Sequence, residues 1–156
     1  MKKRDDHFLE LAIKQAEQSR KNGNHPFGAL LVDENQQILL AAENTVVTQK
    51  DVTAHAEINL IRAATKSFSA DKLSLCTLYS SAEPCPMCAS AMVWANIRHV
   101  VFALGMDKLY SAFGDIGDAP TLKVESREIF KFAPWSMKVI GPMMEKEALG
   151  PHSNFW

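Results

Sequence analysis

The first twenty residues carry apolar positions at the spacing of an amphipathic helix. The members of this apolar face are Phe8, Leu9, Ala12, Ile13 and Ala16. Charged and amide side chains occupy positions between them, and the pair Asn22-Gly23 ends the pattern. The pattern therefore predicts a first helix that packs its apolar face against a sheet.

Two short apolar runs follow, at residues 27–32 and 37–42, and the polar tetrapeptide 33–36 separates them. Two such runs around a polar turn predict a β-hairpin. Gly28, inside the first run, is compatible with a close approach of neighbouring backbone or with a β-bulge. Asn44 follows the second run and is typical of a turn residue.

The middle of the chain alternates between helical and strand patterns. The expected elements are a helix over about 53–66, a loop over 67–72, a strand over 73–80, a helix over about 85–96 and a strand over 98–104. Beyond residue 105 the expected elements are a short helix near 108–112, short strands or extended segments at 128–132 and 137–140, and a helix at 143–149. This order predicts an α/β fold in which a mixed sheet has helices on both faces.

Composition narrows the class of protein. A chain of 156 residues with 47% hydrophobic residues is expected to form a single domain over residues 1–156. The net charge of −1 argues against electrostatic binding of nucleic acid. No long apolar stretch follows Met1-Lys2-Lys3-Arg4, so neither a signal peptide nor a membrane helix is expected. The three cysteines suggest no disulfide pairing, and we expect a cytoplasmic protein with no membrane partner.

The most distinctive chemistry stands in two short segments, 53–57 and 83–88. His55, Cys85 and Cys88 offer one imidazole and two thiolates, which is one ligand short of the four that tetrahedral Zn²⁺ takes. A catalytic zinc keeps that position open for a water molecule, whose pKa it lowers from about 15.7 towards about 7. A Cys-x-x-Cys pair alone also suits a redox site or half of a structural zinc site. No fourth ligand stands at zinc-finger spacing, so the combination favours a catalytic zinc.

The spacing of these residues predicts where they lie. Cys85 and Cys88 are three residues apart, so at the start of a helix they project from one face, and a flanking proline suits such a start. His55 and Glu57 are two residues apart and converge only around a helix end. Two helix N-termini are therefore expected at one metal, where they favour negative charge. His55, Cys85 and Cys88 already supply the three expected ligands, so Glu57 is an acidic residue near the metal that is not needed as a ligand. It therefore suits a proton shuttle.

The two segments together form the pattern H-x-E…P-C-x-x-C, and with the predicted elements the chain resembles the cytidine deaminase superfamily over about residues 7–105. Within it, Pro26-Phe27-Gly28-Ala29 and Trp94 are most similar to bacterial guanine deaminases. The resemblance implies a three-layer α/β/α cytidine-deaminase-like fold. It also implies one Zn²⁺ per chain, bound by His55, Cys85 and Cys88, with Glu57 as the catalytic residue.

The resemblance also implies a set of residues that bind the substrate. Asn44 would hydrogen-bond a base, Phe27 and Trp94 would flank it, and the Ala56 backbone would meet its edge. Guanine deaminases resemble one another in a Gly-Phe-Asp-Asp stretch whose acid reads the base. This chain has Ala112-Phe113-Gly114-Asp115-Ile116-Gly117-Asp118 there, so Asp115 is the better candidate for that role and Asp118 is the alternative.

The chain ends on Trp156, which is unusual because chain ends are generally polar and disordered. Guanine deaminases that resemble this chain also end on an aromatic residue. We expect Phe155 or Trp156 to cover the substrate pocket, in the same chain or in the partner of a homodimer, and packing in a surface groove is the alternative.

The function implied is hydrolytic deamination of a free nucleobase, guanine to xanthine and ammonia. The alternatives are a tRNA adenosine deaminase, or a deaminase of cytosine, a pterin, a triazine or a nucleoside. A tRNA enzyme predicts a basic surface. Residues 138–156 hold only Lys138 and Lys146 against Glu145 and Glu147, which disfavours nucleic acid as a partner.

Overall fold

The computed structural model describes residues 2–114 and 120–156. Within them a five-stranded sheet has the order β2-β1-β3-β4-β5. The strands are β1 (Gly28–Val32), β2 (Ile38–Glu43), β3 (Thr77–Ala82), β4 (His99–Leu104) and β5 (Lys138–Ile140). β1 runs antiparallel to β2 and to β3, whereas β3, β4 and β5 are parallel. The predicted mixed sheet is confirmed.

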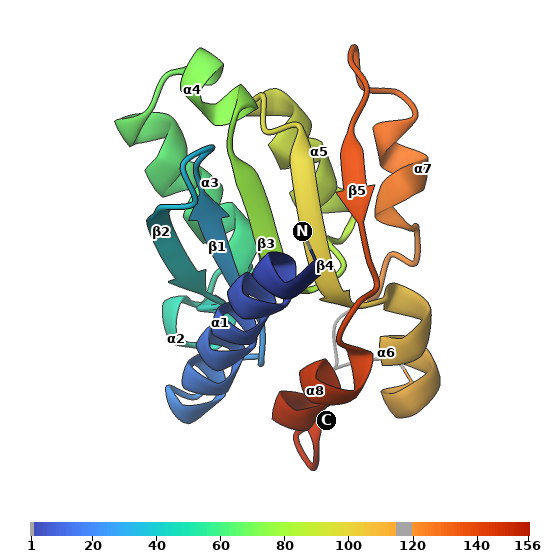
Figure 1. Ribbon diagram of the computed structural model, residues 1–156. Helices are drawn as coiled ribbons and strands as arrows, with labels where there is room; N and C mark the ends of the chain where they lie inside the picture. Colours follow the sequence, from blue (N-terminus) through green and yellow to red (C-terminus); the bar gives the residue numbers. More distant parts are fainter. Residues whose placement is uncertain (1, 115–119) are drawn as a thin grey trace.

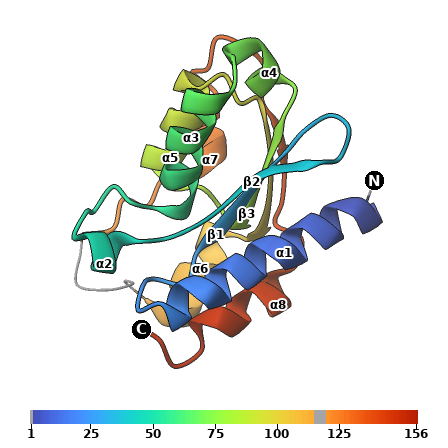
Figure 2. The same ribbon diagram turned by 90° about the vertical axis from the view of Figure 1, so that its left-hand side faces the viewer.

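Helices cover both faces of this sheet, and Figures 1 and 2 show the three layers. The helices of one face are α1 (Lys2–Lys21) and α8 (Glu145–Leu149), and those of the other are α3 (Ala56–Ser67), α5 (Pro86–Trp94) and α7 (Ser126–Phe130). The shorter connecting helices are α2 (Val46–Gln49), α4 (Ala70–Ser74), α6 (Met106–Phe113) and the 3₁₀ helix η1 (Gly150–His152). In the described part of the chain, no helix combines the length and the apolar character needed to cross a membrane.

Each face of the sheet has its own apolar core because successive strand residues point to opposite sides. In β1, Ala29 and Leu31 join the core beneath α3 and α5, whereas Leu30 and Val32 join the core beneath α1. All four side chains are buried. This explains why the first run of the hairpin is continuously apolar rather than alternating.

Three short elements differ from the prediction, and each is set by a side chain that caps a helix. The expected loop over 67–72 is interrupted by α4, whose N-cap Ser69 accepts a hydrogen bond from the Lys72 backbone N–H at 3.2 Å. The expected extended segment at 128–132 is instead helical in α7, where the Glu83 carboxylate accepts hydrogen bonds from the backbone N–H and the hydroxyl of Ser126. The unpredicted α2 is held by Asn24, whose amide oxygen accepts from two backbone N–H groups of that helix.

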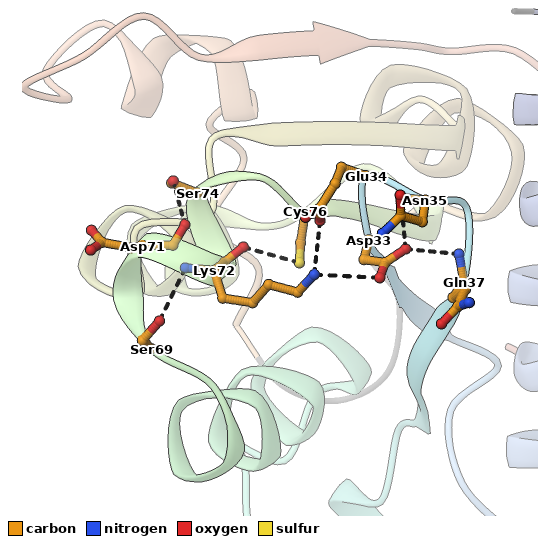
Figure 3. A network of polar contacts seen from close by, with 9 residues as sticks. All are labelled: Asp33, Glu34, Asn35, Gln37, Ser69, Asp71, Lys72, Ser74 and Cys76. Carbon is orange, nitrogen blue, oxygen red and sulfur yellow. Dashed lines mark hydrogen bonds and ion pairs between the residues drawn. The ribbon is translucent and has the colours of Figure 1, made fainter.

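The turn of the β1–β2 hairpin is tied to α4 by a polar network (Figure 3). The Asp33 carboxylate accepts hydrogen bonds from the backbone N–H groups of Asn35 and Gln37, both at 2.9 Å. Lys72 from α4 reaches Glu34 at 2.9 Å and Asp33 at 3.4 Å. Cys76 lies beside this network, fully buried, and burial raises the pKa of its thiol. Its role is therefore that of a small core residue.

Gly28 allows α1 to pack directly on β1. A Cβ at this position would stand 2.4 Å from the Ala12 carbonyl oxygen and 2.4 Å from the Gln15 Cβ. The register irregularity of the hairpin lies elsewhere, between Leu31 and Val32. Of the two explanations offered by the sequence, close backbone approach is the correct one for Gly28.

Replacing Gly28 with alanine should lower the free energy of unfolding by about 2–3 kcal/mol, because the new methyl group forces α1 away from the sheet. Urea unfolding measures this loss. Gly150→Ala is the matched control, since a Cβ there meets nothing within 4 Å. Equal stability of the two variants would show that α1 tolerates the displacement.

Candidate active site

The strand segments that build the site meet at one end of the sheet. β1 begins there, directly after Phe27, and its antiparallel partner β2 ends there, directly before Asn44. The parallel strands β3 and β4 also finish at this end of the sheet, where Ala82 pairs with Leu104. The loops leaving these strands lead into α3, α5 and α6. Mixed topology thus places residues distant in sequence around a single cleft.

The three predicted ligands meet at two helix N-termini, as expected. His55 is the N-cap residue of α3, and Cys85 is the N-cap residue of α5. The His55 Nδ1 atom lies 3.5 Å from the Cys85 Sγ and 3.6 Å from the Cys88 Sγ. Zinc–sulfur bonds of about 2.3 Å and zinc–nitrogen bonds of about 2.0 Å at tetrahedral angles require a separation of about 3.5 Å. All three ligand atoms lie within 4.8 Å of one another, so the set fits a zinc ion.

The electrostatics of the ligands also suit a cation. A hydrogen bond with the Cys88 thiol, supported by the imidazole of His55, lowers the pKa of Cys85 to about 4. The same hydrogen bond and burial raise the pKa of Cys88 well above its usual value. These opposite shifts favour a thiolate at Cys85, and a bound divalent cation deprotonates a coordinating thiol outright. The positive ends of α3 and α5 favour this negative charge.

Glu57 lies beside the ligands without being one of them. It stands in the first turn of α3 and is 5% exposed. Its Oε1 atom accepts a hydrogen bond of 2.7 Å from the Ser80 hydroxyl, and its Oε2 atom lies 3.6 Å from the Cys88 Sγ. Burial raises the pKa of this carboxyl group. Sequence reasoning missed Ser80, although a hydroxyl within an apolar central strand was a signal for a buried polar contact.

A cleft of about 320 Å³ opens above these groups, within the size range of small-molecule sites. His55, Glu57 and Cys85 line it together with Phe27 and Asn44. Asn44 is buried, and its amide oxygen accepts a hydrogen bond of 3.0 Å from the Val46 backbone N–H. The structure therefore brings two of the sequence-predicted substrate residues to the metal ligands.

Trp156 also lines the cleft, and it does so from its own chain. The ring lies 6.2 Å from Phe27 and 5.2 Å from His25, centroid to centroid. Its indole N–H donates a hydrogen bond of 3.0 Å to the Nδ1 atom of His152. Sequence reasoning pointed to the chain end but missed both histidines.

The structure does not bring every predicted residue to the cleft. Trp94 is the last residue of α5 and is 91% exposed. Because α5 begins at the ligands and rises about 1.5 Å per residue, Trp94 lies a full helix length away from them, and it does not line the cleft of its own chain. Ala56 opens α3 between His55 and Glu57, with its side chain fully buried in the core. Asp115 and Asp118 lie outside the described residues.

Several residues at the cleft were not singled out in the sequence. Apolar side chains dominate this group, which comprises Val46, Val52, Met106, Leu109 and Leu122. Glu83 lines the cleft as well, and its carboxylate holds the first turns of α6 and α7 through the backbone N–H groups of Met106 and Ser126, each at 3.0 Å. Single apolar residues scattered over several loops form no periodic pattern, so the sequence alone does not predict that they line a cleft.

His152 is the most deeply buried polar residue of the chain end. It is 1% exposed and packs against Phe27, Phe113 and Trp156. Burial lowers its pKa to about 4, and the nearby charge of Arg20 acts in the same direction. The imidazole is therefore neutral at pH 7.

The family model for the zinc-binding region of cytidine and deoxycytidylate deaminases matches residues 2–104. The chain therefore belongs to this family of zinc-binding deaminases, which are hydrolases. His55, Cys85 and Cys88 are placed to hold its metal ion.

Individual relatives act on different substrates. The chain is 40% identical over 156 residues to a probable cytosine deaminase of Schizosaccharomyces pombe, covering 100% of this chain and 94% of that protein. It is 38% identical over 121 residues to a tRNA-specific adenosine deaminase of Aquifex aeolicus, covering 75% and 78%. The structure of a guanine deaminase from Bacillus subtilis aligns with a TM-score of 0.64 at 34% identity, covering 76% of this chain and 84% of that one.

The burial of His152 predicts a pH-dependent loss of stability. Its pKa is depressed from 6.5 to about 4 in the folded chain, so the unfolded chain binds more protons between these values. The stabilisation is fully present above pH 6.5 and is lost as pH falls towards 4. Relative to His152→Phe, the wild type should lose about 2 kcal/mol of unfolding free energy between pH 7 and pH 5. Urea unfolding at both pH values measures it, and a constant difference would mean that His152 titrates normally.

Proposed function

We propose that this chain is a zinc-dependent hydrolytic deaminase of a free nucleobase. One observation carries the proposal. The buried acid Glu57 lies 3.6 Å from a ligand sulfur at a cleft that the chain's own last residue lines. An acid beside three metal ligands suits proton transfer, and a cleft lined by aromatic and apolar side chains suits a planar ring.

Glu57 moves the protons of the reaction. A zinc ion held by His55, Cys85 and Cys88 would supply Lewis-acid activation of the attacking water. Glu57 takes a proton from that water as its oxygen bonds to the amine-bearing carbon, and passes this proton to the substrate. Glu57 then takes the remaining proton of the new hydroxyl group and gives it to the amino group, the carbon–nitrogen bond breaks, ammonia leaves, and the oxygen stays on the ring as a carbonyl. The Ser80 hydroxyl holds the Glu57 Oε1 atom, which leaves Oε2 beside the ligands.

Asn44 orients the base and Phe27 contacts its face. The amide oxygen of Asn44 accepts from a backbone N–H, so the orientation of the amide is determined and its nitrogen is the group offered to the cleft. That nitrogen donates to a carbonyl oxygen or ring nitrogen of the substrate. A buried amide of this kind rejects analogues that lack the acceptor.

Cytosine is the first candidate for the base. The relative matched across 100% of this chain, including the segment beyond residue 105, is a probable cytosine deaminase. Guanine, which the resemblance implied, is the second candidate, supported by the structural match to a guanine deaminase over 76% of this chain. Transfer RNA is disfavoured because residues 138–156 carry no basic cluster and Trp156 lines the cleft, where its ring restricts the approach of a base that is part of a larger nucleic acid.

A homodimer is part of this proposal. The large apolar side chains of Trp94, at the end of α5, and Phe132, just after α7, are 91% and 89% exposed. A second copy would cover these rings, since exposed aromatic residues are favoured at interfaces.

Changing Glu57 to glutamine separates proton transfer from metal binding. Turnover should fall by at least about 10²-fold because the amide cannot shuttle protons, while zinc content and folding stay intact. Metal analysis and steady-state kinetics measure both. Glu17→Gln, on the exposed face of α1, is the control for the charge change and should leave turnover unchanged.

Cys85→Ala should lose the zinc. Loss of zinc from Glu57→Gln would make Glu57 a ligand.

The substrate class is tested by ammonia release across a panel of cytosine, guanine, adenine, their nucleosides and transcribed tRNA. We expect turnover of a free base, cytosine first, with the matching nucleoside at least about tenfold worse in kcat/KM because Trp156 restricts the cleft. Activity on tRNA with none on any free base would contradict the proposal.

A further inference from the structure

The chain end is held against the cleft by residues from the opposite end of the sequence. The C-terminal segment, defined here as residues 150–156, begins with the 3₁₀ helix η1, which packs beside α1 (Figure 2). Trp156, in the same segment, lines the cleft. Chain ends generally fray unless side chains tie them down. The contacts that prevent fraying here therefore decide whether Trp156 can serve the site.

One such contact is a hydrogen bond within the segment. The indole Nε1–H of Trp156 donates to the His152 Nδ1 at 3.0 Å, and the two rings are stacked at 21° with centroids 6.0 Å apart. Because Nδ1 accepts this bond, the proton of the neutral imidazole is on Nε2. His152 is itself held by Phe27, at 5.1 Å in an edge arrangement, and by Phe113, stacked at 5.9 Å. The acceptor is thus buried and packed between two aromatic rings.

A second contact fixes the backbone on both sides of His152. The Nη1 atom of Arg20, at the end of α1, donates to the carbonyl oxygens of Pro151 at 2.8 Å and Ser153 at 2.6 Å. The same guanidinium lies 5.4 Å from the centre of the Phe155 ring. Arg20 therefore clamps the residues that precede and follow His152, and it does so without touching the cleft.

We propose that His152 is a positioning residue that holds the Trp156 indole over the cleft, with Arg20 fixing the backbone that carries it, so that both set the affinity for a planar base. The inference rests on the proposed function, since it assigns Trp156 to substrate binding. Neither His152 nor Arg20 touches the reacting atoms. Loss of the hydrogen bond should therefore weaken binding of the base and leave proton transfer at Glu57 largely unchanged.

The test compares two replacements of His152. His152→Phe keeps an aromatic ring between Phe27 and Phe113 but has no acceptor. His152→Asn places an amide oxygen close to the former Nδ1 and keeps the acceptor. We expect His152→Phe to raise KM for the free base about three- to tenfold, the range for one lost neutral hydrogen bond, with kcat changed less than about twofold. His152→Asn should recover most of the loss. If His152 served only to fill space between the rings, His152→Phe would instead keep a KM near that of the wild type and His152→Asn would have the higher KM.

A spectroscopic arm follows the hydrogen bond itself. The indole N–H resonance of Trp156 is assigned in ¹H–¹⁵N spectra by its disappearance in Trp156→Phe. In His152→Phe it should shift upfield and exchange faster with water, whereas in His152→Asn it should stay near its wild-type position. The double variant His152→Phe/Trp156→Phe should have the same KM as Trp156→Phe alone, because His152 acts only through the Trp156 indole. An unmoved resonance, or additive effects, would overturn the inference.

The two proposals fail in different ways. Titration of zinc-loaded Glu57→Gln with cytosine or guanine, followed at the Trp156 resonance, measures binding without turnover. If the wild type deaminates a free base but the Trp156 indole N–H resonance does not shift when the base is added, the proposed function stands and the role of His152 is contradicted. If no free base binds or reacts, the proposed function falls, and the inference on substrate affinity falls with it. Zinc content and thermal unfolding of each variant exclude global misfolding as the cause.

Discussion

The convergence of two helix N-termini on three ligand atoms is the constraint on which the rest of the structure depends. β2 and β3 lie on either side of β1 and end at the same end of the mixed sheet, and the helices that follow them, α3 and α5, begin there with His55 and Cys85 as their N-cap residues. A sulfur–nitrogen separation of 3.5 Å leaves little freedom for either helix to shift. The shared apolar core beneath both helices is therefore a support for metal geometry as well as a source of stability.

Placing an acid at this point sets function against stability. Glu57 is 5% exposed, and burial disfavours its charged form and raises its pKa. The hydrogen bond from Ser80 offsets part of the free-energy cost of desolvating the carboxylate, and the positive end of α3 offsets a further part. The outcome is an acid that is costly to bury but well suited to hold and release a proton, which is the usual pattern at catalytic sites.

Side chains from the first part of the chain hold the C-terminal segment in a defined position. Arg20, His25 and Phe27 come from the first part of the chain and surround residues that close it. Ring contacts exclude water around His152, and that exclusion keeps the imidazole neutral and able to accept the indole N–H. A charged imidazole would donate from both nitrogens and could not make this contact. Packing and hydrogen bonding at the chain end therefore reinforce each other.

The sequence by itself determined the set of metal ligands and the order of most helices and strands, because both follow from patterns among residues that are close together in the chain. Cys85 and Cys88 are three residues apart, His55 precedes Glu57 by two, and apolar periodicity marks α1, β1 and β4. The tertiary structure alone decided the rest. α7 is helical where local pattern favoured an extended segment, since Glu83, 43 residues earlier, caps it. Trp94 matched a family position yet lies at the exposed end of α5. The clamp on residues 151–153 joins positions 131 and 133 apart, and no local periodicity records contacts of that range, because only the folded sheet brings both chain regions to the same edge.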